Sequence, residues 1–253
     1  MTKKTIGLIC AIPQERAGLK AVLDHDETVR IAGLDFDRGV LDGRTVILAE
    51  AGIGKVNTAL VATLLASRFN ADLLAFSGVA GGLDPALAIG DLVIAERAIQ
   101  HDCGVIEDSG LQPYQAGHVP FFNPTDQLGY VAAPDMMARI KSALADLDFP
   151  PLAAEAGGSG KTAEIAYGTI LAGDQYIHSE ATRERLHRTF AAKAVAMEGG
   201  AMAQVAERFG LPWLEIRALS DLAGTSSRFD FARFVDAVAK RSATVFHRIL
   251  PVL

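Results

Sequence analysis

Short, uninterrupted apolar runs recur along this chain, and segments with helical periodicity separate them. The clearest runs cover residues 6–11, 72–77, 91–96 and 213–219. A strand is apolar along its whole length when helices cover both faces of its sheet, as they do around parallel strands. The alternation therefore predicts the α/β class, with a three-layer αβα sandwich around a mixed, largely parallel central sheet.

Weaker signals extend this expected order. Residues 167–172 and 194–196 are further candidate strands, and an Asp-Gly pair predicts a tight turn in a hairpin over 35–50. Residues 100–134 lack a clear period and are expected to form a long loop, and the glycine-rich segment 157–160 a second, mobile loop.

Helices are expected between these strands. The first starts at Pro13, which suits the first turn of a helix, and places Leu19, Val22 and Leu23 on one face. The others are expected at residues 56–69, 134–147, 178–189, 199–209 and 230–250.

Size and composition exclude several classes of protein. The chain has 253 residues, of which 50% are apolar, so it has enough apolar surface to avoid disorder and is expected to form one domain over 1–253. Lys and Arg number 24 against 30 Asp and Glu, and the resulting charge of -6 argues against a nucleic-acid partner. The first apolar run ends at Pro13, too early for a signal peptide or a membrane span.

The cysteines indicate a reducing compartment. Cys10 and Cys103 are too few for a disulfide framework, and Cys10 lies in an apolar run where it is expected to pack in the core. The segment 209–213, which ends at Trp213, is also expected in the core. Neither a CxxC nor an HExxH spacing occurs. We therefore expect a cytoplasmic protein with no metal and no cofactor.

Polar or glycine-rich clusters follow five of the expected strands. They are Glu15, 78–82, 173–177, 197–200 and the pair Ser220-Asp221. In sheets of this kind, sites form at the carboxyl ends of the strands, so the five clusters are expected to converge on one crevice. Each also has a simpler explanation: a solvated acid in the first turn of a helix, a helix cap, or a tight turn at glycine.

The order and spacing of these segments resemble the 5′-methylthioadenosine/S-adenosylhomocysteine nucleosidases of the purine nucleoside phosphorylase/hydrolase superfamily. The resemblance covers nearly the whole chain, and its most specific parts are the Met-Glu and Arg-Ala-Leu-Ser-Asp segments. The matching stretches are IGLICAIPQE, AGIGKVNTALVATLL, SGVAGGLDPALAIGDLVIAE, LAGDQYI, VAMEGGA, IRALSDLA and RFDFARFVDAVAKRS.

The resemblance implies hydrolysis of the N-glycosidic bond of adenine thionucleosides and a role for each matching residue. Adenine leaves poorly until its N7 is protonated; Asp221, oriented by Ser220, matches the acid that does this. Glu15 matches the base that activates water on the opposite face of the sugar, the logic of inverting glycoside hydrolysis. The implied substrate-binding residues are Val79, Ala80, Gly81, Tyr176 (adenine stacking), Ile177 (purine edge), Met197 (below the sugar), Glu198 (ribose hydroxyls), Arg217 (support of Glu198) and Phe231 (5′-alkylthio group).

The chain also departs from the family pattern. Val79 replaces a Ser, Ala196 replaces a Glu, and Tyr176 replaces the more frequent Phe. The loop 100–134 is longer than usual and carries the pair Phe121-Phe122. The family implies a homodimer in which this region reaches the 5′ pocket of the partner; a lid over its own site is the alternative.

Three other functions stay open at this point. A phosphorylase needs cations around phosphate, but the nearby Arg16 is expected to face solvent and Val79 offers no side-chain hydrogen bond. A futalosine-type nucleosidase would keep the chemistry and change the substrate. A nucleoside-binding protein without activity would be expected to lose Glu15 or Asp221, and both are present.

Overall fold

A ten-stranded mixed sheet forms the centre of the molecule. The computed structural model describes residues 4–152 and 160–253. The central pairs β1–β4, β1–β5 and β12–β5 are parallel, as predicted, and antiparallel strands join them. In order across the sheet the strands are β11 (Ala194–Ala196), β10 (Ile165–Ala172), β6 (Leu92–Gln100), β12 (Trp213–Asp221), β5 (Leu73–Gly82), β1 (Thr5–Cys10), β4 (Arg44–Glu50), β3 (Leu34–Leu41) and β2 (Asp24–Ile31), with β9 (Tyr130–Val131) beside β6.

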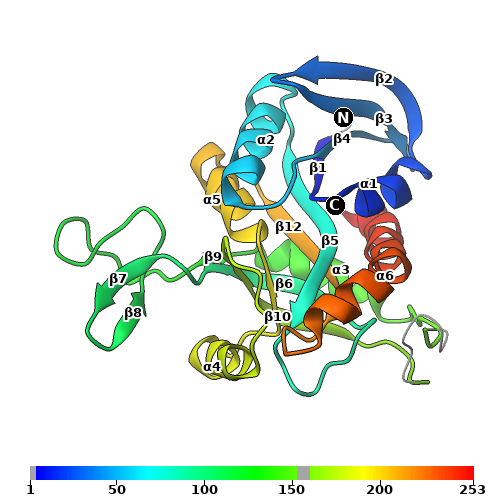
Figure 1. Ribbon diagram of the computed structural model, residues 1–253. Helices are drawn as coiled ribbons and strands as arrows, with labels where there is room; N and C mark the ends of the chain where they lie inside the picture. Colours follow the sequence, from blue (N-terminus) through cyan, green and yellow to red (C-terminus); the bar gives the residue numbers. More distant parts are fainter. Residues whose placement is uncertain (1–3, 153–159) are drawn as a thin grey trace.

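Helices cover both faces of this sheet and complete the predicted three layers (Figure 1). On one face, α2 (Lys55–Arg68) packs against α5 (Gly199–Phe209). On the other face, α6 (Ser227–Ile249) lies over β5 and β12 and contacts both α1 (Pro13–Lys20) and α3 (Pro134–Leu144). The remaining helices are α4 (Glu180–Phe190) and the 3₁₀ turn η2 (Leu250–Val252). No helix in the described ranges is long and apolar enough to span a membrane.

One end of the sheet closes on itself. Strand β11 pairs with β10 and also, antiparallel, with β5, where Val195 lies opposite Gly81. Strand β12 runs beside β5 on its other side, and its Asp221 also pairs with Gly81. The ends of three strands therefore meet around Gly81, which gathers at one point the segments that sequence analysis marked as polar.

Two of those segments lie inside strands, which corrects the prediction that they follow them. Strand β5 continues through the glycine-rich residues 78–82, and β12 includes Ser220 and Asp221. Pairing with β12 explains the first extension, since Arg217 lies opposite Gly78 and Ala218 opposite Val79. Small residues keep β5 paired while leaving room for side chains that lie over it.

The polypeptide between 100 and 134 is partly ordered rather than one long loop. It contains a two-stranded hairpin, β7 (Gly104–Glu107) and β8 (Gly110–Pro113), which projects from the body of the molecule (Figure 1). The predicted helix face at the start of the chain is also shorter: α1 ends at Lys20, Val22 is exposed, and Leu23 is buried beyond the helix. Of the predicted mobile loop 157–160, residues 157–159 lie outside the described residues.

Two residues that sequence analysis placed in the core, Cys10 and Trp213, lie there. Cys10 and Trp213 are both buried, and both belong to the main apolar cluster around the sheet. Phe209 was also expected in the core, and this prediction is wrong: it ends α5 and is 45% exposed. Phe209 is the last residue of α5, so no further helical turn covers its ring.

Asp37 of β3 is a fully buried carboxylate that binds side chains of α1 and so links this helix to the sheet. It accepts hydrogen bonds from Arg16 Nη2 (2.7 Å), Lys20 Nζ (3.1 Å) and Thr28 Oγ1 (2.7 Å). Burial raises the pKa of Asp37, but the bonds from Thr28, Arg16 and Lys20 outweigh it and lower the pKa to about 2. The prediction that Arg16 faces solvent is therefore wrong, since a buried carboxylate needs a cationic partner.

Candidate active site

One pocket brings together all the residues that sequence analysis assigned to the site. It lies where β1, β5, β11 and β12 end. The twelve predicted residues that line it are Glu15, Val79, Ala80, Gly81, Tyr176, Ile177, Met197, Glu198, Arg217, Ser220, Asp221 and Phe231. The expected convergence of five separate segments on one crevice is therefore what the fold produces.

Glu15 is a buried acceptor at the floor of this pocket. It is only 3% exposed, so it is not a solvated acid of the first helical turn. Its Oε2 accepts from the backbone N–H of Ala11 (2.7 Å) and Ile12 (3.2 Å), and its Oε1 accepts from that of Val79 (2.8 Å). Gly78 permits this approach, because a Cβ there would lie 2.6 Å from Oε1.

The environment of Glu15 gives its carboxyl a pKa near neutrality. Burial raises the pKa, and Glu198 acts in the same direction. Arg217 and the backbone hydrogen bonds oppose this, and the result is a pKa of about 7. A carboxyl with this pKa can take up and release a proton near neutral pH, which is what a general base requires.

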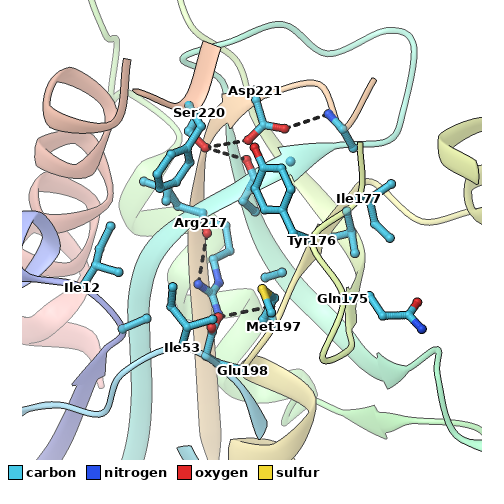
Figure 2. Close-up of a pocket in the computed structure, with 18 of the residues that line it drawn as sticks. Ile12, Ile53, Gln175, Tyr176, Ile177, Met197, Glu198, Arg217, Ser220 and Asp221 are labelled. Atoms are coloured by element: carbon cyan, nitrogen blue, oxygen red, sulfur yellow. Dashed lines mark hydrogen bonds and ion pairs between the residues drawn. The ribbon is translucent and has the colours of Figure 1, made fainter. Parts of the chain in front are cut away.

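Arg217 and Glu198 form a buried ion pair beside Glu15. Arg217 Nη2 lies 3.0 Å from Glu198 Oε2, and its Nη1 donates to the carbonyl of Val79 at 3.1 Å. Glu198 stands at the N-cap of α5, and its Oε1 accepts from the N–H of Gly54 at 3.2 Å. The predicted support of Glu198 by Arg217 thus exists as a direct contact, visible in Figure 2.

Asp221 occupies the other end of the pocket, together with Ser220 (Figure 2). Its Oδ2 accepts from Ser220 Oγ at 3.0 Å, and its Oδ1 accepts from the N–H of Ala223 at 2.8 Å. Burial raises the pKa of Asp221 even though both hydrogen bonds act to lower it. A raised pKa helps the carboxyl to keep the proton that an acid must donate.

Two aromatic rings stand at the mouth of the pocket. Tyr176 is 45% exposed and packs edge-on against Phe231, with ring centroids 6.3 Å apart. Ser227 Oγ donates to the carbonyl of Ile177 at 3.3 Å and lies 2.8 Å from His178 Nδ1. His178 lies just before α4. Its contact with Ser227 links the loop that carries Tyr176 to the start of α6.

Sequence analysis missed a polar cluster that joins the loops around the pocket, here called the Asp102 cluster: Lys55, Asp102 and Asp174. Asp102 lies 2.6 Å from Lys55 Nζ and accepts from the N–H of Asp174 at 2.9 Å. Asp174 in turn accepts from the N–H of Lys55 at 2.8 Å. Its members are far apart in sequence, so no local pattern could have predicted it. Sequence analysis also assigned no role to seven further residues that line the pocket: Ala11, Ile12, Ile53, Gln175, Val195, Ala196 and Ala223.

Among residues 4–152 and 160–253, no group of three or more His, Cys, Asp or Glu side chains is arranged to hold a metal ion. The side chains that line the pocket offer carboxyls, one guanidinium, a hydroxyl, an amide, a thioether and aromatic rings.

Comparison with known proteins identifies the family. Residues 5–251 match the family model described as the phosphorylase superfamily. The 5′-methylthioadenosine/S-adenosylhomocysteine nucleosidase of Mycobacterium bovis is 55% identical over 249 residues, which is 98% of each chain. This chain belongs to the 5′-methylthioadenosine/S-adenosylhomocysteine nucleosidase family. The resemblance inferred from the sequence motifs is thereby confirmed.

Solved structures agree with this family and with the predicted fold. The S-adenosylhomocysteine nucleosidase of Streptococcus pyogenes, in complex with 5-methylthiotubericidin, is 29% identical with a TM-score of 0.84, over 100% of this chain and 98% of that chain. The futalosine hydrolase of Helicobacter pylori is 27% identical with a TM-score of 0.83, over 99% of this chain and 98% of that chain. The nucleosidase family thus shares its architecture with an enzyme named for a different substrate.

Proposed function

We propose that this protein hydrolyses the N-glycosidic bond of 5′-methylthioadenosine and S-adenosylhomocysteine and releases adenine and the thioribose product. The observation that carries this is the pocket itself: Glu15 and Asp221, two buried carboxyls with raised pKa values, line it together with the Arg217–Glu198 pair. The 55% identity to a nucleosidase over 98% of both chains supports the same reaction.

In the proposed reaction, Asp221 protonates N7 of adenine while Ser220 orients its carboxyl. The sugar develops oxocarbenium character as the bond breaks. Glu198, held by Arg217, binds the ribose hydroxyls beside the reacting carbon. Glu15 takes a proton from the attacking water on the opposite face, so the anomeric centre inverts.

The remaining lining residues are proposed to select the substrate. Tyr176 stacks on adenine, and the backbone of Ile177 reads the purine edge. Met197 packs below the sugar, and Phe231 lines the space for the 5′-alkylthio group. Val79, Ala80 and Gly81 form the wall of the pocket along β5.

The nucleophile is testable because a phosphorylase needs a cationic phosphate site. Among the described residues that line the pocket, Arg217 is the one cation, and its Nη1 and Nη2 already bind Val79 and Glu198. We expect 5′-methylthioadenosine to be cleaved at the same rate with and without phosphate, with free methylthioribose as the product. Identification of a sugar 1-phosphate as the main product would contradict the proposal. Futalosine is a weaker candidate substrate, since the relative that is 55% identical is a 5′-methylthioadenosine/S-adenosylhomocysteine nucleosidase and the futalosine hydrolase is 27% identical.

The homodimer is proposed from apolar side chains left exposed near the pocket. Val56 and Leu60 lie one turn apart near the start of α2, Ile53 lies just before the helix, and their exposed fractions are 79%, 45% and 53%. Ile53 also lines the pocket, so a partner covering this face would help to close the site. Phe121 and Phe122 of the 100–134 segment are more than 80% exposed. We propose that they too contact the partner subunit.

We expect a dimer that buries well over about 1,000 Å² in total. Val56→Glu should dissociate it, because a carboxylate would be desolvated in the apolar contact, and turnover should fall as the pocket opens beside Ile53. Sedimentation and kinetics on the same sample measure both effects. Val22→Glu, at an exposed apolar residue just after α1, is the matched control and should leave the mass unchanged. A fully active wild-type monomer in dilute solution would rule the dimer out.

We also infer that residues 1–253 act as a single nucleosidase domain in a reducing cytoplasm. The family match from residue 5 to residue 251 supports the first part. The free thiols of Cys10 and Cys103 support the second.

A further inference from the structure

Glu215 is a buried carboxyl that the proposed chemistry leaves unused. It lies in β12, two residues before Arg217, and its exposed fraction is 0%. Its Oε1 accepts from Arg217 Nε at 2.8 Å. Its Oε2 has no hydrogen-bond partner in the described part of the chain. Burying an acid with a single polar contact is unfavourable, so packing in the core does not explain why Glu215 is an acid.

The start of α5 is shaped around this carboxyl. Gly199 is the first residue of α5, and a Cβ at that position would collide with all three carboxyl atoms of Glu215. Glu215 therefore requires glycine at this point and lies against the positive end of the helix, which favours an acid. Burial raises the pKa of Glu215 and Arg217 opposes it, but either ionisation state leaves an oxygen that can accept from Nε.

The bond from Nε fixes the plane of the whole guanidinium. Arg217 lies over the ring of Phe76, with its Cζ 4.0 Å from the ring centroid. With Nε held by Glu215 and one face held by Phe76, Nη1 meets Val79 and Nη2 meets Glu198. Glu215 and Phe76 lie outside the residues lining the pocket, and of these two Glu215 is the hydrogen-bond acceptor.

We propose that Glu215 is a positioning residue that sets the orientation of Arg217 and, through it, the recognition of the ribose hydroxyls by Glu198. The proposal rests on the function proposed above. It assigns to this buried acid a role in discriminating a ribose from a deoxyribose, although the acid itself touches no substrate.

The test compares 5′-methylthioadenosine with its 2′-deoxy analogue. In Glu215→Leu the buried Nε loses its acceptor, so kcat/KM for the ribonucleoside should fall by about 10- to 100-fold, the cost of one hydrogen bond to a charged group. The deoxy analogue should lose much less, so the preference for ribose falls with it. Glu215→Gln keeps an oxygen for Nε and should lie between wild type and Glu215→Leu.

Gly199→Ala supplies a second route if Glu215→Leu does not fold. It leaves Glu215 in place but forces its carboxyl away from α5, and it should also lower the preference for ribose. Asp91→Asn is the matched control: Asp91 is a buried acid whose side chain accepts from the N–H of Ala88 and Glu164, and it does not line the pocket. It should lower the melting temperature and leave the preference unchanged.

The inference is overturned if the Glu215 and Gly199 variants that fold lose stability but keep the wild-type preference for ribose. A failure of the proposed function looks different: the wild-type protein would then not cleave 5′-methylthioadenosine without phosphate at all.

Discussion

Asp221→Asn is expected to lower turnover of 5′-methylthioadenosine by about 10²- to 10⁴-fold, the usual contribution of a general acid. The amide keeps the size of the side chain but has no proton to transfer to N7, so adenine must leave as a much poorer leaving group. Binding should suffer less, because Asn can still contact N7. Single-turnover kinetics and the Kd of an unreactive adenine nucleoside separate the two effects.

A structural role for Asp221 makes a different prediction. Its Oδ1 accepts from the N–H two residues ahead, a local bond that Asn forms about as well as Asp. Asp84 provides the matched control, since its Oδ1 accepts from the N–H of Ala86 in the same way. Asp84→Asn should leave turnover at the wild-type level. Equal turnover in Asp221→Asn would remove Asp221 from the chemistry.

Glu15→Gln is expected to lower kcat by a similar factor of about 10²- to 10⁴-fold, because an amide cannot take a proton from water. A second effect follows from the surroundings. Three backbone N–H groups point at the two carboxyl oxygens, so the NH₂ of Gln must face at least one donor. The melting temperature should therefore fall as well, and kcat must be measured on folded protein.

The pH profile gives an independent test of Glu15. A general base works only when deprotonated, and the pKa of Glu15 is about 7. The kcat/KM of the wild-type protein should therefore fall as the pH drops below about 7 and level off above it. Asp135→Asn, at an exposed acid in the first turn of α3, should keep this profile. An acidic limb that stays near the ordinary pKa of a Glu would contradict the assignment.

Sequence analysis could predict those parts of the fold whose strands are apolar along their length. Runs such as that of β1 are buried along their length, so their composition shows them directly. Strand β2 was not predicted, because it lies at the edge of the sheet, is mostly exposed and has the polar sequence DHDETVRI. The hairpin β7–β8 escaped for the same reason, since its residues contact each other rather than a core.

The residues of the site could be predicted, but only two of their contacts could, those of Arg217 with Glu198 and of Ser220 with Asp221. The order of the motifs identified every assigned lining residue. The pKa of Glu15 depends on Val79 and Arg217, and the role of Glu215 depends on the missing side chain of Gly199; no local pattern carries either fact. Arg16 was misplaced because its partner, Asp37, lies in a different element.

Lys55 of the Asp102 cluster follows Gly54 in the chain, and the backbone N–H of each residue donates to an acidic side chain beside the pocket. The N–H of Gly54 holds Glu198, and the next N–H, that of Lys55, holds Asp174 at the head of the loop that carries Tyr176. The two N–H groups belong to consecutive peptide units that meet at the Cα of Gly54, whose φ of 102° is a conformation that favours glycine. In the proposed reaction, the residue that binds the sugar and the loop that binds the base are therefore held by backbone donors on either side of one glycine Cα.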